Sequence, residues 1–375
     1  MWRAAVTAAS LRTLPRYSAA RPLSTTLLNP LLSLHCPTPS SRTMSTTAIP
    51  ETMKGVLAVA VGGPEVLEYR TDLPVPKPGN GQVLVKNTTV GINYIDTYFR
   101  GGIYPSPKPE VLGRDGEGHI VAVGEGETYG LKQGDRVVWM GSGGYAEYSA
   151  ISALHVARIP EGIPDTIAVA SLLQGLTALT MIRESHNTKP GEFCLVHAAA
   201  GGVGLWLCQL LKALGARVIG TASNAAKIEE AKRNGAEFMI DYSQEKDLVA
   251  RVMEFTNGQG VEAVFDGVGK DTFEDDLKVV KRKGTLVSFG NASGVVPPFS
   301  ITKLAPKCIK LLRPQVFGYI ATREEFTTYT EELFRIIQQD KLDVKIHKIY
   351  ELQDVQTVHR DLEGRKTMGK LLMRP

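Results

Sequence analysis

The stretch "VHAAAGGVGLWLCQLLKALGARVIGTAS", residues 196–223, decides the fold. An apolar run leads into a glycine-rich turn, a helical run follows, and a second apolar run closes the segment. The turn has the form G-x-G-x-x-G, with Ala199 at the first glycine position and then Gly201 and Gly204. Gly201 lets the backbone approach a pyrophosphate, Gly204 lets helix and strand pack closely, and the helix N-terminus offers free N–H groups. In this strand-to-helix context the pattern predicts a dinucleotide site rather than a merely structural turn.

The second apolar run lacks the acid that commonly holds the adenosine ribose of NAD. That acid stands about 20 residues after the glycine turn, whereas the run here ends in "GTASN", residues 220–224. A carboxylate there would repel a 2′-phosphate, but the Ser223 hydroxyl and the Lys227 cation would bind one, and Tyr242 could cover the same pocket. The segment therefore predicts NADP(H) as the cofactor, although Lys227 on its own could also be an ordinary exposed helix lysine.

The rest of the chain predicts an α/β protein with two folded domains. Residues 54–172 form short alternating runs with Gly and Pro between them, which indicates a β-rich domain. Over residues 173–312, continuously apolar strands alternate with helical runs, which predicts a doubly wound parallel sheet. Within it we expect a helix over 272–284 and a strand over 285–290. Residues 313–375, with a long amphipathic helix over 323–339, are expected to return to the first domain.

The N-terminal 44 residues differ from the rest in composition. They contain Arg3, Arg12, Arg16, Arg21 and Arg42, no acid, and many Ser, Thr, Ala and Leu residues. This composition predicts a mitochondrial presequence. A disordered tail or a rarely translated extension remains an alternative, and initiation at Met44 would give a cytoplasmic form. Removing the five positive charges from the net charge of +4 leaves −1, which argues against a broad nucleic-acid surface.

Cysteine usage and hydropathy further narrow the class of protein. Apart from Cys36, the chain has Cys194, Cys208 and Cys308 among apolar neighbours without CxxC spacing. We expect these three to be buried free thiols in a reducing compartment. No uninterrupted apolar run reaches the roughly 18 residues that span a bilayer, so we expect no membrane association.

Four motifs together carry a family resemblance. They are "GINYIDTYFRGGIYP" (91–105), "GDRVVW" (134–139), "HAAAGGVG" (197–204) and "LVSFGNASG" (286–294). With them the chain resembles the zinc-free quinone oxidoreductases, the zeta-crystallin-like branch of the medium-chain dehydrogenase/reductase superfamily, from about residue 54 to 375. The resemblance implies a GroES-like β domain, a Rossmann domain, NADP(H) in the cleft between them, and homodimers that pair Rossmann edge strands, here residues 304–320.

The resemblance also implies site residues, and at one motif this chain differs from the family pattern. At "GRDGEG", residues 113–118, the family often has "GTEAAG", so substrate preference stays open. The implied contacts are Asn93, Asp96, Tyr98, Thr177, Phe289, Gly290 and Asn291 near the nicotinamide, Gly201, Gly202 and Val203 at the pyrophosphate, Ser223, Lys227, Tyr242 and Arg365 at the 2′-phosphate, and Arg313 beside the cofactor.

We expect no metal. Alcohol dehydrogenases of the superfamily hold catalytic zinc through a Cys, a "GHE" histidine and a third ligand, and zinc requires such ligands to converge. Here residues 113–115 replace the "GHE" motif, Asn93 falls close to the Cys position, and the four-cysteine lobe is absent. Without a Lewis acid, reducing an easily reduced acceptor is feasible, whereas oxidising an alcohol is hard.

The predicted reaction is hydride transfer from NADPH to a quinone. Tyr98 and Asn93 are candidates for hydrogen bonds to the acceptor or the nicotinamide amide, and Asp96 is expected to orient its neighbours. Tyr98 either donates a proton or only shapes the pocket. The alternatives are an enoyl or alkenal reductase of the same superfamily, and a non-catalytic RNA-binding or crystallin-like protein. The absence of an RNP-like aromatic motif argues against RNA.

Overall fold

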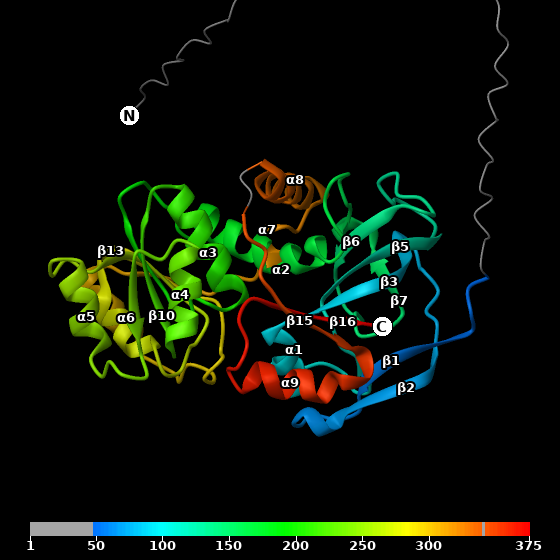
Figure 1. The fold of residues 1–375 in the computed structure, drawn as a ribbon, viewed down its shortest axis with the longest axis horizontal. Helices are drawn as coiled ribbons and strands as arrows, with labels where there is room; N and C mark the ends of the chain where they lie inside the picture. Colours follow the sequence, from blue (N-terminus) through cyan, green and yellow to red (C-terminus); the bar gives the residue numbers. More distant parts are fainter. Residues whose placement is uncertain (1–47, 340–341) are drawn as a thin grey trace, which may run out of the picture. The chain divides into compact units, whose positions relative to one another are not determined.

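The computed structural model describes residues 48–339 and 342–375. The expected presequence, residues 1–44, and Cys36 lie outside the described residues. Residues 49–375 form one compact unit, in which a parallel sheet and a β-rich half lie on either side of helix α2 (Ile167–Thr180) (Figure 1). We describe these two halves in turn because the site lies between them.

The parallel sheet has the strand order β11-β10-β9-β12-β13-β14, the order typical of a Rossmann fold. Neighbouring residues of one strand face opposite sides, so Val218 and Ile219 belong to two separate apolar clusters, and both are fully buried. The continuous apolar strands of the sequence are thus explained by burial on both faces. The strands are β9 (Phe193–Val196), β10 (Arg217–Ala222), β11 (Phe238–Asp241), β12 (Val261–Asp266), β13 (Val280–Ser288) and β14 (Lys310–Leu312).

Helices connect these strands, and one of them is shorter than predicted. The helix expected over 272–284 ends at Val279, because Val280 pairs with Val261 in the sheet. The strand bulges after this pair, with Lys283 at a positive φ of 67°, so strand β13 begins five residues earlier than expected. The connecting helices are α3 (Gly202–Ala213), α4 (Ala225–Arg233), α5 (Leu248–Phe255) and α6 (Phe273–Val279).

The β-rich half contains two sheets. One has the order β2-β1-β4, and the other has the order β15-β16-β3-β5-β6-β8 with β7 also paired to β3. The strands are β1 (Thr52–Ala58), β2 (Leu67–Pro74), β3 (Gln82–Ile92), β4 (Glu110–Val111), β5 (Asp115–Val123), β6 (Arg136–Met140), β7 (Tyr148–Ser152), β8 (Val156–Arg158), β15 (Ile346–Glu351) and β16 (Lys370–Arg374). Because β16 pairs with β3, the C-terminal segment belongs to the larger sheet of the β-rich half, as predicted from the sequence.

Helix α2 lies where the two halves meet. Helix α2 continues into a π-helical turn, Met181–Ser185, and contacts α3, α8, β5 and β6, so the predicted boundary at 172/173 falls inside it. Residues 167–185 are long and apolar enough to cross a membrane by length and composition, but 72% of that window is buried inside the protein. The other helices are α1 (Tyr94–Arg100), α7 (Val316–Tyr319), α8 (Arg323–Gln339) and α9 (Val355–Glu363).

The three described cysteines are free, but only two match the expected burial. Cys194 and Cys208 are buried in the parallel-sheet half, whereas Cys308 is exposed. The prediction for Cys308 was wrong because the residue ends a 3-10 turn, Ile301–Lys307, in a left-handed conformation with φ of 52°. Apolar neighbours in sequence therefore do not surround it in space.

Candidate active site

A cleft of about 690 Å³ lies between the parallel sheet and the β-rich half, a volume typical of small-molecule sites. Most of the predicted site residues line it. They are Asn93, Tyr98, Thr177, Gly201, Gly202, Val203, Ser223, Lys227, Tyr242, Phe289, Gly290 and Arg365. Asp96, Asn291 and Arg313 do not line the cleft, and each of them holds a residue or loop that does.

The glycine turn fits a pyrophosphate. Its backbone turns sharply between β9 and α3, and a Cβ atom on Gly204 would lie 2.3 Å from the Ala198 carbonyl oxygen, so only glycine allows this packing. The N-terminus of α3 opens into the cleft, where free N–H groups favour an anion. The turn also contacts the last strand, because the Gly369 N–H donates to the Ala200 carbonyl at 3.0 Å.

Two cations lie together at the adenosine end of the cleft. The Lys227 ammonium donates to the Arg365 carbonyl oxygen at 2.7 Å, and burial, with Arg365 nearby, lowers the pKa of Lys227. Within the described part of the chain, neither side chain pairs with an acid. Ser223 and Tyr242 line the cleft with them. A pair of neighbouring cations without a counter-ion fits the 2′-phosphate of NADP(H).

A buried ammonium organises the opposite end of the cleft. The Lys370 Nζ atom donates to Asn93 Oδ1 and Asp115 Oδ2 at 2.7 Å each and to Gln174 Oε1 at 2.9 Å. Asn93 Nδ2 donates to Asp115 Oδ1, and Gln174 Nε2 donates to Asn93 Oδ1, both at 2.7 Å. All four side chains belong to residues that are exposed by 7% or less. We call these four residues the Lys370 cluster.

The Lys370 cluster presents its positive side to the cleft. Asn93, Gln174 and Lys370 line the cleft, whereas Asp115 lies behind them. Each primary amide carries two N–H groups, and only one on Asn93 and one on Gln174 is used in the bonds above. The remaining amide N–H groups and the ammonium are suited to stabilise negative charge that develops on a bound acceptor.

Helix α1 brings aromatic residues across the cleft. The Tyr98 hydroxyl accepts the Asn291 N–H at 2.7 Å, and the Tyr94 hydroxyl donates to the Ala292 carbonyl at 3.2 Å. Burial raises the pKa of Tyr98 well above its usual value, so this phenol stays protonated and keeps its own O–H free to donate. The Arg313 guanidinium supports the same loop by donating to the Gly290 carbonyl at 3.0 Å.

Asp96 lies behind Asn93 and positions it. One carboxylate oxygen accepts the Asn93 N–H at 2.8 Å and the Tyr145 hydroxyl at 2.8 Å, while the other is buried without a partner. Burial raises the pKa of Asp96 to about 6. Asp96 is fully buried outside the cleft, so it does not line the nicotinamide site as the resemblance implied for a catalytic residue. Its contacts support the orienting role instead.

A zinc ion does not fit the nicotinamide end of this cleft. The oxygens of Asn93, Asp115 and Gln174 converge on the Lys370 ammonium at 2.7–2.9 Å, and a divalent cation at that point would be repelled by it. Arg114 stands where alcohol dehydrogenases of the superfamily have the zinc-binding "GHE" histidine, and its guanidinium cannot bind a metal ion. No step of the reaction is therefore assigned to a metal.

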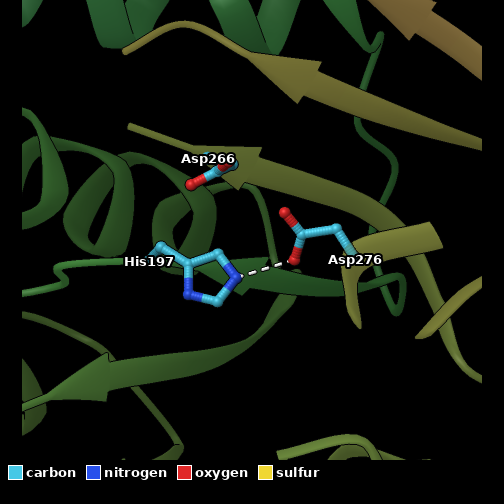
Figure 2. A group of neighbouring side chains, drawn as sticks. All are labelled: His197, Asp266 and Asp276. Carbon is cyan, nitrogen blue, oxygen red and sulfur yellow. Dashed lines mark hydrogen bonds and ion pairs between the residues drawn. The ribbon is translucent and has the colours of Figure 1, made fainter. Parts of the chain in front are cut away.

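Figure 2 shows the group of described residues with ligand atoms close enough to share an ion, His197, Asp266 and Asp276, whose nearest ligand atoms lie within 4.8 Å of one another. His197 Nε2 lies 2.8 Å from Asp276 Oδ1, and the Asp266 carboxylate accepts the N–H groups of Val268 and Gly269. Although burial alone would lower it, the Asp276 charge raises the pKa of His197. These contacts fix the start of the glycine turn, because His197 directly follows strand β9.

The comparisons with known proteins agree with this geometry. Residues 79–161 match the family "Alcohol dehydrogenase GroES-like domain", and residues 202–335 match "Zinc-binding dehydrogenase". A Schizosaccharomyces pombe protein named probable quinone oxidoreductase is 42% identical over 319 residues, 85% of this chain and 96% of the relative. A Burkholderia 2-haloacrylate reductase is 33% identical over 325 residues, 84% and 96% of the two chains. The crystal structure of Escherichia coli quinone oxidoreductase complexed with NADPH superposes with a TM-score of 0.83 at 41% identity, covering 86% and 100%.

The chain belongs to the quinone oxidoreductases of the medium-chain dehydrogenase/reductase superfamily. The predicted family, the two-part α/β fold and the oxidoreductase class are thus confirmed. The prediction of NADP(H) is supported by the NADPH bound in the E. coli structure. The individual site residues remain predictions, which the geometry above refines.

Sequence reasoning missed two residues of this quinone oxidoreductase site. Gln174 was hidden in an apolar helix, and Lys370 was hidden in the last strand, "KLLMR". The sequence did contain a signal for Lys370. A lysine at the first position of an apolar strand is expected to be buried and therefore to need a partner. Its partners lie in three remote segments, so the sequence did not indicate which acid that would be.

We predict that Lys370→Met lowers the free energy of unfolding by about 3–5 kcal/mol, because it leaves the Asp115 carboxylate buried without its cation. Combining Lys370→Met with Asp115→Asn removes the unpaired charge and should recover part of that loss. Urea denaturation of the full chain, followed by tryptophan fluorescence, measures both. A single variant as stable as the native chain, or a double variant no more stable than the single, would contradict this account of the cluster.

A second prediction concerns the adenosine end. Lys227→Ala should raise the Kd for NADPH by about 10- to 100-fold, the value of a charge-assisted hydrogen bond, with little change for NADH, which lacks the 2′-phosphate. Ser223→Asp should weaken NADPH further by repulsion. Nucleotide fluorescence titration measures these constants, and Lys232→Ala, on the exposed side of the same helix, is the control. An equal rise in Kd for NADPH and NADH would show that Lys227 does not bind the 2′-phosphate.

Proposed function

We propose that this protein reduces quinone-type acceptors with NADPH in the cleft between its two halves. The observation that carries the proposal is the difference in chemistry between the two ends of the cleft. At one end, Lys227 and Arg365 have no acidic partner among the described residues. At the other end, the buried Lys370–Asp115 ion pair lies beside the cleft with the aromatic side chains of Tyr98 and Tyr104. The first end suits the 2′-phosphate, and the second suits a flat conjugated ring that gains negative charge during the reaction.

The chemistry of the reaction divides between the cofactor and the chain. Bound NADPH supplies the hydride, that is, two electrons and one hydrogen nucleus. The quinone gains this hydride and one proton to become a hydroquinone, and NADP⁺ remains; solvent can deliver the proton. The chain contributes binding, orientation and exclusion of water, which together lower the barrier for bringing the two rings into contact.

Named residues perform these tasks. Tyr98 accepts a hydrogen bond from the Asn291 N–H, so its own O–H is free to donate to the acceptor or to the nicotinamide amide. Its raised pKa favours a role as a hydrogen-bond donor over that of an acid. The free amide N–H groups of Asn93 and Gln174, polarised by Lys370, stabilise negative charge on the acceptor oxygen.

Reduction of a conjugated C=C bond is the second candidate. It is favoured by the similarity to the Burkholderia 2-haloacrylate reductase, and the same cleft geometry would support it, because the negative charge again develops on an oxygen conjugated to the carbon that accepts the hydride. An RNA-binding or crystallin-like role receives no support from the site, because Lys227, Arg365 and Lys370 line a cleft.

Assembly and location complete the proposal. We propose a homodimer that pairs edge strands of the parallel sheets. Strand β14 (Lys310–Leu312) is the outer strand on that side, and an open edge offers unpaired backbone groups to a second copy. We also retain mitochondrial import as a proposal, supported by the Arg-rich, acid-free composition of residues 1–44.

Steady-state assays of the full chain test the function. NADPH and NADH are each offered with 1,4-benzoquinone, 9,10-phenanthrenequinone or trans-2-enoyl-CoA. We expect turnover of the quinones with NADPH favoured over NADH by about tenfold or more in kcat/KM, as one charge-assisted contact implies. Turnover of enoyl-CoA with inert quinones would assign the protein to C=C reduction, and a preference for NADH would contradict the roles of Ser223 and Lys227.

A further inference from the structure

The cleft contains a cation without an acidic partner at the point where the sequence departs from its family. Arg114, in "GRDGEG", lines the cleft and is half-buried. Its Nη1 donates to the Ser142 hydroxyl at 2.5 Å, and its Nε is buried with no hydrogen-bond partner. No carboxylate within residues 48–339 and 342–375 forms an ion pair with it. A guanidinium in this state has unused capacity to bind an anion.

The surroundings of Arg114 define the shape of such a ligand. The guanidinium carbon lies 3.7 Å from the centre of the Phe99 ring. Phe99 and Tyr98 each meet Tyr104 edge-on, with ring centres 5.6 and 5.4 Å apart. We call Tyr98, Phe99 and Tyr104 the aromatic wall. All three residues line the cleft, so the wall gives a flat conjugated molecule a surface that ends at a positive charge.

The nearby acids are already committed to other partners. Asp115 is bound to Lys370 and Asn93, and Asp96 is bound to the Asn93 N–H and the Tyr145 hydroxyl. A second arginine, Arg313, donates only to neutral oxygens around the wall, including the Tyr104 hydroxyl at 3.1 Å. Arg114 and Arg313 therefore carry positive charge with which no described carboxylate forms an ion pair.

We propose that Arg114 binds a carboxylate carried by the acceptor, so that the cleft selects flat conjugated acceptors with an anionic substituent over neutral ones. The two terminal nitrogens of a guanidinium form a fork that matches the two oxygens of a carboxylate, and the bond to Ser142 uses only one of the N–H groups on Nη1. The catalytic part of this inference rests on the proposed quinone reduction, but binding of the carboxylate does not require any reaction. Selection by charge would add a substrate class to the uncharged quinones considered above.

Matched acceptors test the selection. The full chain is assayed with NADPH and either 2-carboxy-1,4-naphthoquinone or its methyl ester, which has the same ring without the charge. We expect Arg114→Met to lower the ratio of the two kcat/KM values, acid over ester, by about 10- to 100-fold, because only the acid loses an ionic contact. Arg114→Lys keeps the charge but loses the fork and should give an intermediate ratio. Arg70→Met, which removes an exposed arginine on β2, should leave the ratio unchanged.

A binding measurement separates this inference from the reaction. Calorimetric titration of the NADP⁺-saturated chain with 2-naphthoate and 2-naphthamide should show tighter binding of the acid, and Arg114→Met should abolish that difference. An unchanged acid-to-ester ratio, an equal loss on both quinones, or equal binding of naphthoate and naphthamide by the native chain overturns the proposal. If the native chain reduces neither quinone, the proposed function fails, and the naphthoate titration still decides the role of Arg114.

Discussion

The ion pair between Lys370 and Asp115 is the interaction on which the rest of the site depends. Both groups are almost completely buried, and their nitrogen and oxygen atoms lie 2.7 Å apart. Buried pairs of this kind rarely add net stability, because desolvation consumes most of the attraction. Their value here is geometric. The ammonium fixes the side chains of Asn93 and Gln174, and so joins the end of β3, strand β5, helix α2 and strand β16 at one point.

The same connection ties the acceptor end to the cofactor turn. Gly369, next to Lys370, donates to the Ala200 carbonyl of the glycine turn, and its φ of 69° favours glycine. A Cβ atom there would also lie 2.3 Å from the Lys345 carbonyl oxygen. The last strand thus enters the β-rich sheet only after contacting the parallel-sheet half. This explains why the C-terminal residues return to the first half and still shape the cleft.

Local sequence predicted the parts of the structure that depend on local physics. The glycine turn and the continuously apolar strands required only neighbouring residues, and both appear where expected. Contacts between remote segments were not predictable in this way. The donation from Arg313 to the Gly290 carbonyl could not be inferred from the residues near it in sequence, and the role of Lys370 depends on partners in three distant segments. Val280 resembled a helix residue in sequence, and only its pairing with Val261 across the sheet shows it to be a strand residue.

The central claim is that the cation at the reaction centre is the protein's own ammonium and that quinone reduction needs no metal. The most direct measurement is the metal content of the full chain by mass spectrometry, taken on the same dialysed sample whose oxidation of NADPH by 1,4-benzoquinone is assayed. The account predicts full turnover at a zinc content far below one ion per chain, with no gain when zinc is added. Turnover that rises and falls in proportion to bound zinc would contradict it.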